Sequence, residues 1–297
     1  MITRPMKAVE AGDLSKLIYP RYASAKLDGI RCLKVNGKAL SASFKPIRNI
    51  YVRNYIESTM LPDGFDGELV LAGTKAFNEV SSAIMSEAGT PDFRYALFDH
   101  VKDGNIDEPF IYRYERLKNF ILPSFAYVLE QRIVKSAEEL SLFEEECIAE
   151  GYEGVITRSL AGPYKCGRST LREQYMLKMK RFVDTEGIII GMEEMEHNTN
   201  PAFEGELGQT KRSSAQIGKV SSGVMGALVV EEIKTGVVSK VGTGFSAAER
   251  EWFWQEKISA ITQRWIVTFK HMPYGAVEKH RSGVYKGIRH KEDMTSF

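Results

Sequence analysis

The 297-residue chain contains only three cysteines and five histidines, and it has no long apolar segment. The three cysteines are far apart and odd in number, which excludes a disulfide framework and a paired cysteine metal site: Cys32, Cys147 and Cys166. The few, scattered histidines argue against a metal centre built from imidazoles. No apolar run approaches the roughly 18 residues of a membrane span, and the first residues lack the apolar stretch of a signal peptide. These absences predict a protein of a reducing cytoplasm with no membrane contact.

The chain also lacks an excess of either charge. Forty lysines and arginines stand against 39 aspartates and glutamates, a formal net charge of +1, whereas nucleic-acid-binding proteins are usually basic. The distribution differs from the total. Residues 164–181 carry six basic side chains against one acidic, residues 264–291 carry seven against one, and residues 207–222 carry three against none. Such concentrated positive segments, offset by acidic helices elsewhere, are typical of a nucleic-acid surface.

Short segments rich in β-branched and aromatic residues alternate with a few helices. The strands are expected at residues 22–26, 30–35, 65–71, 95–98, 155–157, 176–180, 188–191, 226–230, 237–241 and 265–269. Helices are expected at 136–150 and 246–261, because each begins with a serine that is followed three residues later by a glutamate. Gly151 stands where the first helix should stop. The Trp252-Phe253-Trp254 cluster is predicted to pack the second helix onto a sheet.

The pattern of predicted strands and helices changes after residue 181, which places a domain boundary near residues 182–185. The strands beyond it are short and unevenly spaced, with one helix between the third and the fourth, and this pattern favours a small β-barrel such as an OB-fold. Residues 197–223 are polar, contain glycine and serine, and show little apolar periodicity. They predict a long loop, functional or disordered.

The densest chemical pattern is Lys26-Leu27-Asp28-Gly29-Ile30-Arg31, at the end of a predicted strand. A lysine is a poor nucleophile while it is protonated, and desolvation and nearby positive charge favour its neutral form. Arg31 can supply that charge or hold a phosphate with its planar guanidinium. The ordinary alternative is a surface lysine beside an Asp-Gly hairpin turn, and these six residues by themselves favour that alternative.

Residues in other predicted strands favour the catalytic interpretation of Lys26 over that of a surface lysine. Carboxylates occur within one predicted strand, at Glu68, and at the start of another, at Glu153, and Phe98 ends a third. Each of these residues also has an explanation without a catalytic role, as a surface carboxylate or as an aromatic residue of the core. Lys178 and Lys180 are two residues apart in a strand, so both side chains leave the same face. Two ammonium groups on one buried face need an anionic partner such as a phosphate chain.

In order and spacing these elements resemble those of the covalent nucleotidyltransferase superfamily, which includes polynucleotide ligases and capping enzymes. The match runs from Lys26 to Lys180 and resumes near the C-terminus. Within the superfamily the chain is similar to compact ATP-dependent DNA ligases of the bacteriophage type. The opening Arg4-Pro5-Met6-Lys7-Ala8, the segment 25–31 and the tail Gly287-Ile288-Arg289-His290-Lys291-Glu292-Asp293 carry that likeness.

The resemblance implies an α+β fold in two parts. Residues 1–181 would form an ATP-grasp-like nucleotidyltransferase domain of antiparallel sheets and helices, and residues 182–297 an OB-fold β-barrel. It also implies ATP and Mg²⁺ as cofactors, with Mn²⁺ as an alternative, and nicked duplex DNA as the partner of a monomer. The setting would be DNA replication, repair or recombination, in the host cytoplasm if a bacteriophage encodes the protein.

The resemblance assigns roles to the residues that match. Lys26 would attack the α-phosphate of ATP, release pyrophosphate and carry the AMP. Phe98 would stack on adenine. Glu68 would contact the ribose or help to hold a metal ion, and Glu153 would bind the metal.

Basic residues would complete the implied site. Lys178 and Lys180 would hold the phosphates, and Arg31 would grip a phosphate or the ribose. Arg289, in the terminal element, would orient the departing pyrophosphate. These roles fit the physics of nucleotidyl transfer, which requires charge neutralisation and in-line positioning more than acid–base chemistry.

One element departs from the family pattern. Many ligases carry Ser-Arg and a later basic residue after the nucleophile, and here the arginine position is occupied by Ala42. Lys45 matches the later basic position and Arg48 is a candidate substitute, so both are expected to contact DNA at the nick phosphate.

Three further basic residues are expected to touch the duplex from the polar 207–222 segment: Lys211, Arg212 and Lys219. The alternative is a disordered surface loop. For the whole chain the open alternatives are an RNA ligase, an mRNA guanylyltransferase with the same lysine chemistry, and a non-catalytic nucleic-acid-binding OB protein.

Overall fold

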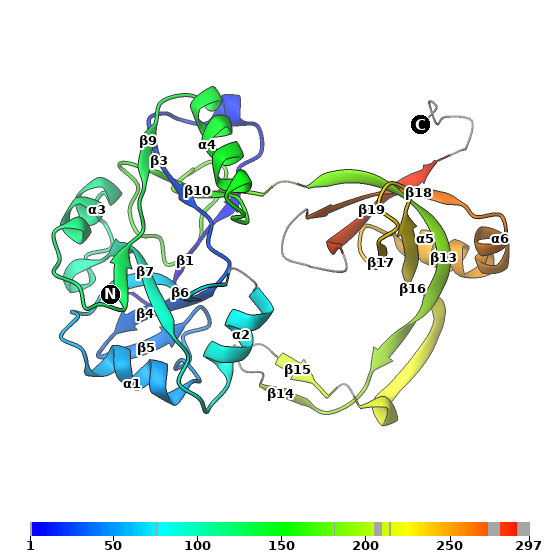
Figure 1. The fold of residues 1–297 in the computed structure, drawn as a ribbon, viewed down its shortest axis with the longest axis horizontal. Helices are drawn as coiled ribbons and strands as arrows, with labels where there is room; N and C mark the ends of the chain where they lie inside the picture. Colours follow the sequence, from blue (N-terminus) through cyan, green and yellow to red (C-terminus); the bar gives the residue numbers. More distant parts are fainter. Residues whose placement is uncertain are drawn as a thin grey trace. The chain divides into compact units, whose positions relative to one another are not determined.

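A computed structural model describes residues 2–74, 77–180, 182–204, 210–213, 215–272 and 280–289 of the chain (Figure 1). The described residues divide into two compact units, one up to Lys180 and the other from Phe182 onward. No described helix is long and apolar enough to cross a membrane.

Two five-stranded sheets build the first unit. One sheet has the strand order β2-β12-β10-β3-β9, with these bounds: β2 Val9–Glu10, β12 Met176–Met179, β10 Val155–Ser159, β3 Arg21–Ala25 and β9 Arg132–Val134. The other has the order β5-β4-β6-β7-β8, with these bounds: β5 Lys38–Ser41, β4 Ile30–Val35, β6 Phe65–Leu71, β7 Phe93–His100 and β8 Ala126–Val128. A short parallel pair joins β1 (Met6–Lys7) to β11 (Gly167–Arg168).

Four α-helices cover these sheets: α1 Ile50–Ser58, α2 Phe77–Met85, α3 Phe110–Lys118 and α4 Ala137–Ala149. Helices α1, α2 and α3 bury apolar side chains against the β4–β8 sheet, in a core that includes Phe65, Leu69 and Leu117. Helix α4 packs on the other sheet through Leu140 and Cys147 (Figure 1). The expected serine cap of α4 is confirmed, since the Ser136 side chain accepts the Glu139 amide, and the helix ends before Gly151 at φ +82°.

The expected strands of this unit are confirmed. Strands β4 and β6 have the predicted bounds, β3 and β7 differ from them by one to two residues at both ends, and β10 and β12 differ only at their last residues. The reason is that their branched and aromatic residues are buried on a pleated surface, which is the environment that strand propensity reflects.

The second unit is a five-stranded sheet of order β17-β16-β13-β18-β19. Its bounds are β13 Val183–Asn198, β16 Lys219–Glu232, β17 Val238–Val241, β18 Ile266–Met272 and β19 Arg281–Arg289. The edge strands approach each other just beyond β17, where Thr243 forms a single parallel bridge with Val284. Among the described residues the sheet therefore curls toward a barrel without a continuous closing ladder.

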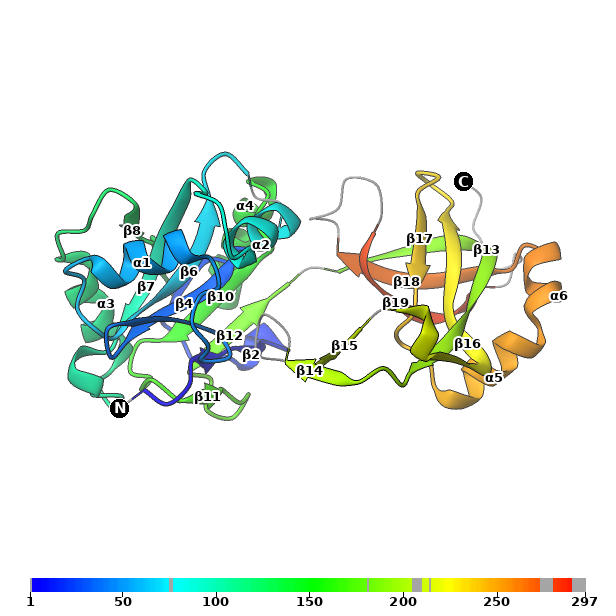
Figure 2. The same cartoon turned by 90° about the horizontal axis from the view of Figure 1, so that it is seen from below.

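The single helix predicted for residues 246–261 is divided into two helices in the structure. Residues 246–261 form α5 (Ala247–Gln255) and α6 (Lys257–Thr262), which lie beside β16 and β13 (Figure 2). The expected capping box at Ser246 and Glu249 is present in full. Of the aromatic cluster, Phe253 is completely buried, whereas Trp252 is 41% exposed and stacks on Trp265. The packing prediction thus holds for Phe253 and for Trp254, which is partly buried against the same core, and not for Trp252.

The long loop expected at residues 197–223 is wrong for its described part. Strand β13 continues to Asn198, β16 begins at Lys219, and a hairpin of β14 (Ala202–Glu204) and β15 (Thr210–Arg212) lies between them. Residues 205–209 and 214 of this segment lie outside the described residues. A narrow ribbon with most side chains exposed has no apolar alternation, so its sequence resembles that of a loop.

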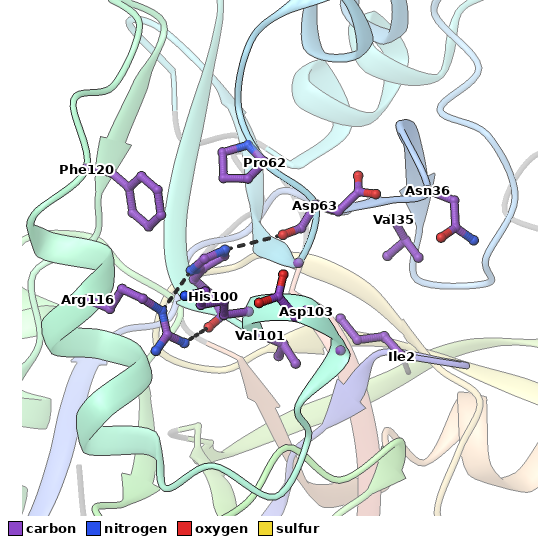
Figure 3. Close-up of a pocket in the computed structure, with 13 residues that line it drawn as sticks. Ile2, Val35, Asn36, Pro62, Asp63, His100, Val101, Asp103, Arg116 and Phe120 are labelled. Atoms are coloured by element: carbon purple, nitrogen blue, oxygen red, sulfur yellow. Dashed lines mark hydrogen bonds between the residues drawn. The ribbon is translucent and has the colours of Figure 1, made fainter.

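A cavity of about 570 Å³ lies at the end of β7 in the first unit (Figure 3). His100 lies in its wall, 2% exposed and stacked on Phe65. The ring accepts a hydrogen bond from Arg116 Nε at Nδ1, at 3.2 Å, and its Nε2 lies 3.3 Å from the Asp63 carbonyl oxygen. Burial and the neighbouring Arg116 charge lower the pKa of His100 to about 4. The ring is therefore held neutral.

We predict that replacing His100 with glutamine flattens the pH dependence of stability. Unfolded histidine takes up a proton near pH 6.5, so between about pH 6.5 and 4 the unfolded state binds more protons. The free energy of unfolding then falls as the pH is lowered, by up to about 3 kcal/mol for this side chain. Urea unfolding at pH 7.5 and 4.5 measures the difference. His197→Gln, at an exposed position, should keep the wild-type slope, and parallel curves for His100→Gln would contradict the account.

Candidate active site

Lys26 lies at the point where the chain leaves β3 and crosses to β4, and so passes from one sheet of the first unit to the other. The Lys26 amide donates to the Gly154 carbonyl at 2.8 Å, and the Glu153 amide donates to the Lys26 carbonyl at 3.3 Å. Gly154 has φ +147°, and a Cβ there would lie 2.1 Å from the Met179 carbonyl oxygen. Only glycine permits this approach, which brings the residues after β3 and β12 beside Glu153.

The Glu153 carboxylate is shared by two lysines. Lys26 Nζ contacts one of its oxygens and Lys180 Nζ contacts the other. The Glu153 side chain is only 4% exposed, and burial by itself would raise its pKa. The two ammonium groups outweigh that effect and hold the pKa of Glu153 below its ordinary value. The arrangement fixes the Lys26 amine in position and compensates a buried negative charge.

A cavity of about 300 Å³ opens beside Lys26, between the two sheets. Chemically active side chains in its wall come from both sheets and the link between them: Lys26, Arg31, Glu68, Phe98, Arg158 and Lys178. A second cavity, of about 350 Å³, is lined by Lys26, Asp28, Arg94 and Glu153. The Lys26 amine therefore borders two spaces, one with aromatic and basic walls and one beside the shared carboxylate.

Arg31 is held by a buried carboxylate that the sequence did not indicate. Its Nε and Nη2 donate to the two oxygens of Asp66 at 2.5 and 2.6 Å, and the Tyr164 hydroxyl donates to Asp66 Oδ2 at 2.6 Å. Asp66 is completely buried. The Asp66 charge outweighs the effect of burial and raises the pKa of Arg31. Arg31 is thus a permanent, rigidly oriented cation in the cavity wall.

Glu68 lies two residues after Asp66 on β6, directly across from Arg31 on β4. Burial raises the pKa of Glu68 to about 7, although Arg31 and Lys26 oppose the shift. A Cβ at Gly29 would lie 2.3 Å from the Leu69 carbonyl oxygen, so this glycine permits the close pass of the chain over Glu68. Near neutral pH Glu68 can therefore act as a hydrogen-bond donor or as an anion.

Phe98 presents its ring to two guanidinium groups. The Arg31 guanidinium carbon lies 4.5 Å from the ring centroid and that of Arg158 lies 5.1 Å from it. Arg158 donates from Nη1 to Asp99 at 3.1 Å, while its buried Nε has no hydrogen-bond partner among the described residues. Arg158 was missed in the sequence, although it follows Ile156 by two residues and alternation sends both to the cavity face.

Of the other predicted residues of the first unit, some line the cavity and some do not. Lys178 lines the cavity and pairs with Glu10 at 3.2 Å. Ala42 lines it too, from the turn after β5, so the position where the family carries arginine does face the cavity. Lys45 is exposed in that turn, and the Arg48 guanidinium lies 4.0 Å from Glu87. Neither of these two lines the cavity.

The remaining predicted residues belong to the second unit. Arg289 on β19 donates from Nε to Glu186 at 2.8 Å. On the β14–β15 ribbon Arg212 contacts the Asn200 carbonyl, and Lys219 at the start of β16 lies 3.0 Å from Glu196. The backbone of Lys211 lies in β15, but its side chain is outside the described residues, as are residues 290–297.

Comparison with known proteins supports the resemblance. Residues 5–180 match the family model of the ATP dependent DNA ligase domain. A DNA ligase of African swine fever virus (isolate Tick/Malawi/Lil 20-1/1983) is 26% identical over 191 residues, which are 62% of this chain and 41% of the viral protein. The chain thus spans less than half the length of the curated relatives it matches.

Solved structures extend the likeness to both units. A Chlorella virus DNA ligase-adenylate is 33% identical, with 97% of this chain and all of that chain covered, at a TM-score of 0.57. A Lig E DNA ligase, 23% identical, matches in fold at a TM-score of 0.69 over 97% of this chain and all of its own. The expected α+β fold, a nucleotidyltransferase unit followed by an OB-type unit, is therefore confirmed.

We predict that the Arg31–Asp66–Tyr164 cluster also stabilises the fold. Asp66→Asn leaves the Arg31 charge buried without a counter-charge and should lower the free energy of unfolding by about 3–5 kcal/mol. Tyr164→Phe removes a hydrogen bond to a charged group and the acceptor of the Met6 amide, and should cost about 1.5–3 kcal/mol. Urea unfolding at pH 7.5 measures both. The ion pair of the exposed Lys38 with Glu57 supplies a control, since Lys38→Ala should cost less than about 1 kcal/mol. A loss for Asp66→Asn no larger than this control would refute the prediction.

Proposed function

Since the chain belongs to the ATP-dependent DNA ligase family, we propose that it seals nicks with 3′-hydroxyl and 5′-phosphate ends in duplex DNA. The reaction passes through a covalent lysyl-AMP enzyme and an adenylated DNA strand. The observation that carries the proposal is the Lys26 amine, held by Glu153 at the mouth of a cavity with an aromatic wall and cationic groups. The residues 1–181 act as the nucleotidyltransferase domain and residues 182–297 as the OB-fold domain.

In the first step Lys26 is the nucleophile. A bond forms between Nζ and the α-phosphorus of ATP, the bond from that phosphorus to the bridging oxygen breaks, and pyrophosphate leaves with the electron pair. The Lys26 ammonium group must lose one proton to expose its lone pair and a second as the bond to phosphorus forms. The Glu153 carboxylate, which already contacts Nζ, is placed to accept the first, and the second passes to water. Lys180 on the other Glu153 oxygen keeps this carboxylate oriented.

The cavity wall accounts for nucleotide recognition. Phe98 stacks on the adenine, and Glu68 binds a ribose hydroxyl. Arg31 and Lys178 balance phosphate charge, Arg31 with an orientation that Asp66 enforces. In the second step AMP passes to the 5′-phosphate of the nick, and in the third the 3′-hydroxyl attacks and AMP leaves.

The donor set fits a hard divalent cation. Glu68 and Glu153 offer carboxylate oxygens near Lys26, and Mg²⁺, or Mn²⁺ in its place, prefers such ligands together with water and phosphate oxygens. When bound there, the cation would neutralise charge on the phosphates.

The second unit supplies the remaining contacts in this proposal. Arg289 orients the pyrophosphate, which requires release of its pair with Glu186. Lys211 and Arg212 on the β14–β15 ribbon and Lys219 at the start of β16 touch duplex phosphates, and Lys45 and Arg48 approach the nick. The enzyme acts as a monomer in the cytoplasm, in the host's if a bacteriophage encodes it.

We predict that the purified chain seals a nicked DNA duplex with ATP and Mg²⁺, and that Lys26→Ala abolishes sealing. The same variant should still join a nick that is already adenylated, because the third step does not need the nucleophile. Lys38→Ala, at an exposed position, is the matched control and should seal like the wild type.

Three outcomes of this assay would contradict the proposal. Sealing by Lys26→Ala from ATP would remove the nucleophile, a preference for GTP would favour a capping enzyme, and a preference for nicked RNA would favour an RNA ligase. Failure of Lys26→Ala on the adenylated nick, with a folded protein, would show that Lys26 acts beyond the first step.

We predict that the combined Lys211→Ala, Arg212→Ala and Lys219→Ala variant binds nicked DNA with a shallower dependence on salt. Each lost phosphate contact should reduce the slope of log K against log salt by about 0.9. Affinity is measured by fluorescence anisotropy from 50 to about 200 mM salt. A charge-matched variant at Lys234, Lys240 and Lys257 in the same unit is the control, and an equal slope in both variants would rule out ribbon contacts.

A further inference from the structure

We propose that Glu232, His271 and His280 form a binding site for a transition-metal cation of the Zn²⁺ type, which cross-links strands of the second unit. The inference does not depend on the proposed ligase chemistry. The three residues come from different strands, since Glu232 ends β16, His271 lies in β18 and His280 directly precedes β19. One potential ligand atom of each lies within 4.8 Å of the other two.

The geometry of the cluster is close to that of a bound site. His280 Nε2 lies 2.7 Å from Glu232 Oε2, and the His271 and His280 rings stack with centroids 3.7 Å apart. Ligands around Zn²⁺ at about 2.0–2.2 Å stand roughly 3.3 Å from one another in a tetrahedron. The cation would therefore draw the most distant pair together by at most about 1.5 Å and move Glu232 Oε2 and His280 Nε2 slightly apart, which side-chain rotation can provide.

The chemical class follows from the ligand types. Two imidazoles and one carboxylate suit Zn²⁺ and its neighbours in the first transition row, whereas Mg²⁺ prefers oxygen ligands throughout. The site is sheltered, with side chains 8% exposed for Glu232 and 15% for His280. Three protein ligands leave a fourth position for water.

A supporting set of hydrogen bonds orients these ligands, as partners of metal ligands commonly do. Thr185 Oγ1 donates to Glu232 Oε1 at 2.7 Å, and Thr235 Oγ1 donates to Oε2, the oxygen that faces His280. His271 Nδ1 lies 3.2 Å from the Met272 carbonyl oxygen, and donation there leaves the lone pair on Nε2 for a cation. No described residue forms a hydrogen bond with Nε2 of His271. A simple Glu–His hydrogen bond would explain His280 but not the second imidazole stacked on it.

The location gives the cation a structural task. Strands β16 and β18 flank β13, and the His280 amide donates to Ser239 Oγ in β17 at 2.9 Å. The cluster thus lies on the side of the sheet where the β17 and β19 edges approach each other, an approach that elsewhere rests on a short group of contacts around Thr243 and Val284. A shared cation would link β16, the neighbour of the β17 edge, to β18 and the start of β19, and so stabilise the curl of the sheet.

The test is titration of chelator-treated full-length protein with Zn²⁺ alone, against a chromogenic competitor and in the presence of millimolar Mg²⁺. We expect one Zn²⁺ per chain with a micromolar or tighter Kd, unaffected by Mg²⁺, and a Tm that rises by about 5 °C at saturation. Glu232→Gln and His280→Gln should each weaken binding at least about tenfold. His197→Gln, at an exposed histidine of the same unit, should not.

A second measurement on the unmodified chain keeps the test independent of how the variants fold. Co²⁺ bound by two imidazoles and a carboxylate gives the visible absorption of a low-symmetry, four- or five-coordinate ion, and Zn²⁺ should displace it. Absence of these bands, or Zn²⁺ binding no tighter than about 100 μM, would overturn the proposal. Stoichiometric binding that the Glu232 and His280 variants retain would also overturn it, because the cation would then lie elsewhere.

Discussion

A single buried carboxylate organises the centre of the first unit. Glu153 lies between two lysines, Lys26 after β3 and Lys180 after β12, the strands on either side of β10, and its charge is compensated because both ammonium groups reach it. That convergence depends on backbone geometry, since Gly154 passes so close to Met179 that any side chain would collide. The same close approach sets the position of Lys26 relative to the cavity. The packing of β3, β10 and β12 and the position of the Lys26 amine therefore depend on the same close backbone contact.

The cavity draws its walls from two sheets because the chain crosses from one to the other immediately after Lys26. One sheet supplies Phe98, Glu68 and Arg31, and the other supplies Arg158 and Lys178. Charges at this junction are buried in pairs, Arg31 with Asp66 and Arg158 with Asp99. Pairing of this kind costs desolvation but orients the guanidinium groups, which is what recognition of a phosphate or an aromatic base requires.

Much of the first unit could be predicted from sequence, because its strands are marked by local runs of branched residues and its α4 helix by a serine cap. The site was predictable in part: Lys26, Glu68, Phe98 and Lys178 do border one cavity. Asp66 and Tyr164 could not be found, since they are 98 residues apart and only the fold joins them. The cluster of His271 and His280 with Glu232 was hidden for the same reason, since Glu232 is 48 residues from His280 and only the fold joins them.

The second unit was harder to predict, for physical reasons. The ribbon of β14 and β15 is largely exposed, so no apolar alternation distinguishes it from a loop. The break between α5 and α6 was invisible because Phe253 and Ala260, both buried, are seven residues apart and fit one continuous helix face. The spacing of apolar residues predicts which side chains are buried, but it does not reveal where a helix is interrupted.

The central claim is that the Glu153-bound amine of Lys26 is the group that becomes adenylated. The most direct measurement is peptide mapping by tandem mass spectrometry after incubation of the protein with ATP and Mg²⁺, without DNA. The account predicts one AMP per chain, attached through Nζ of Lys26. AMP on any other side chain, or no covalent AMP in a folded protein, would contradict it.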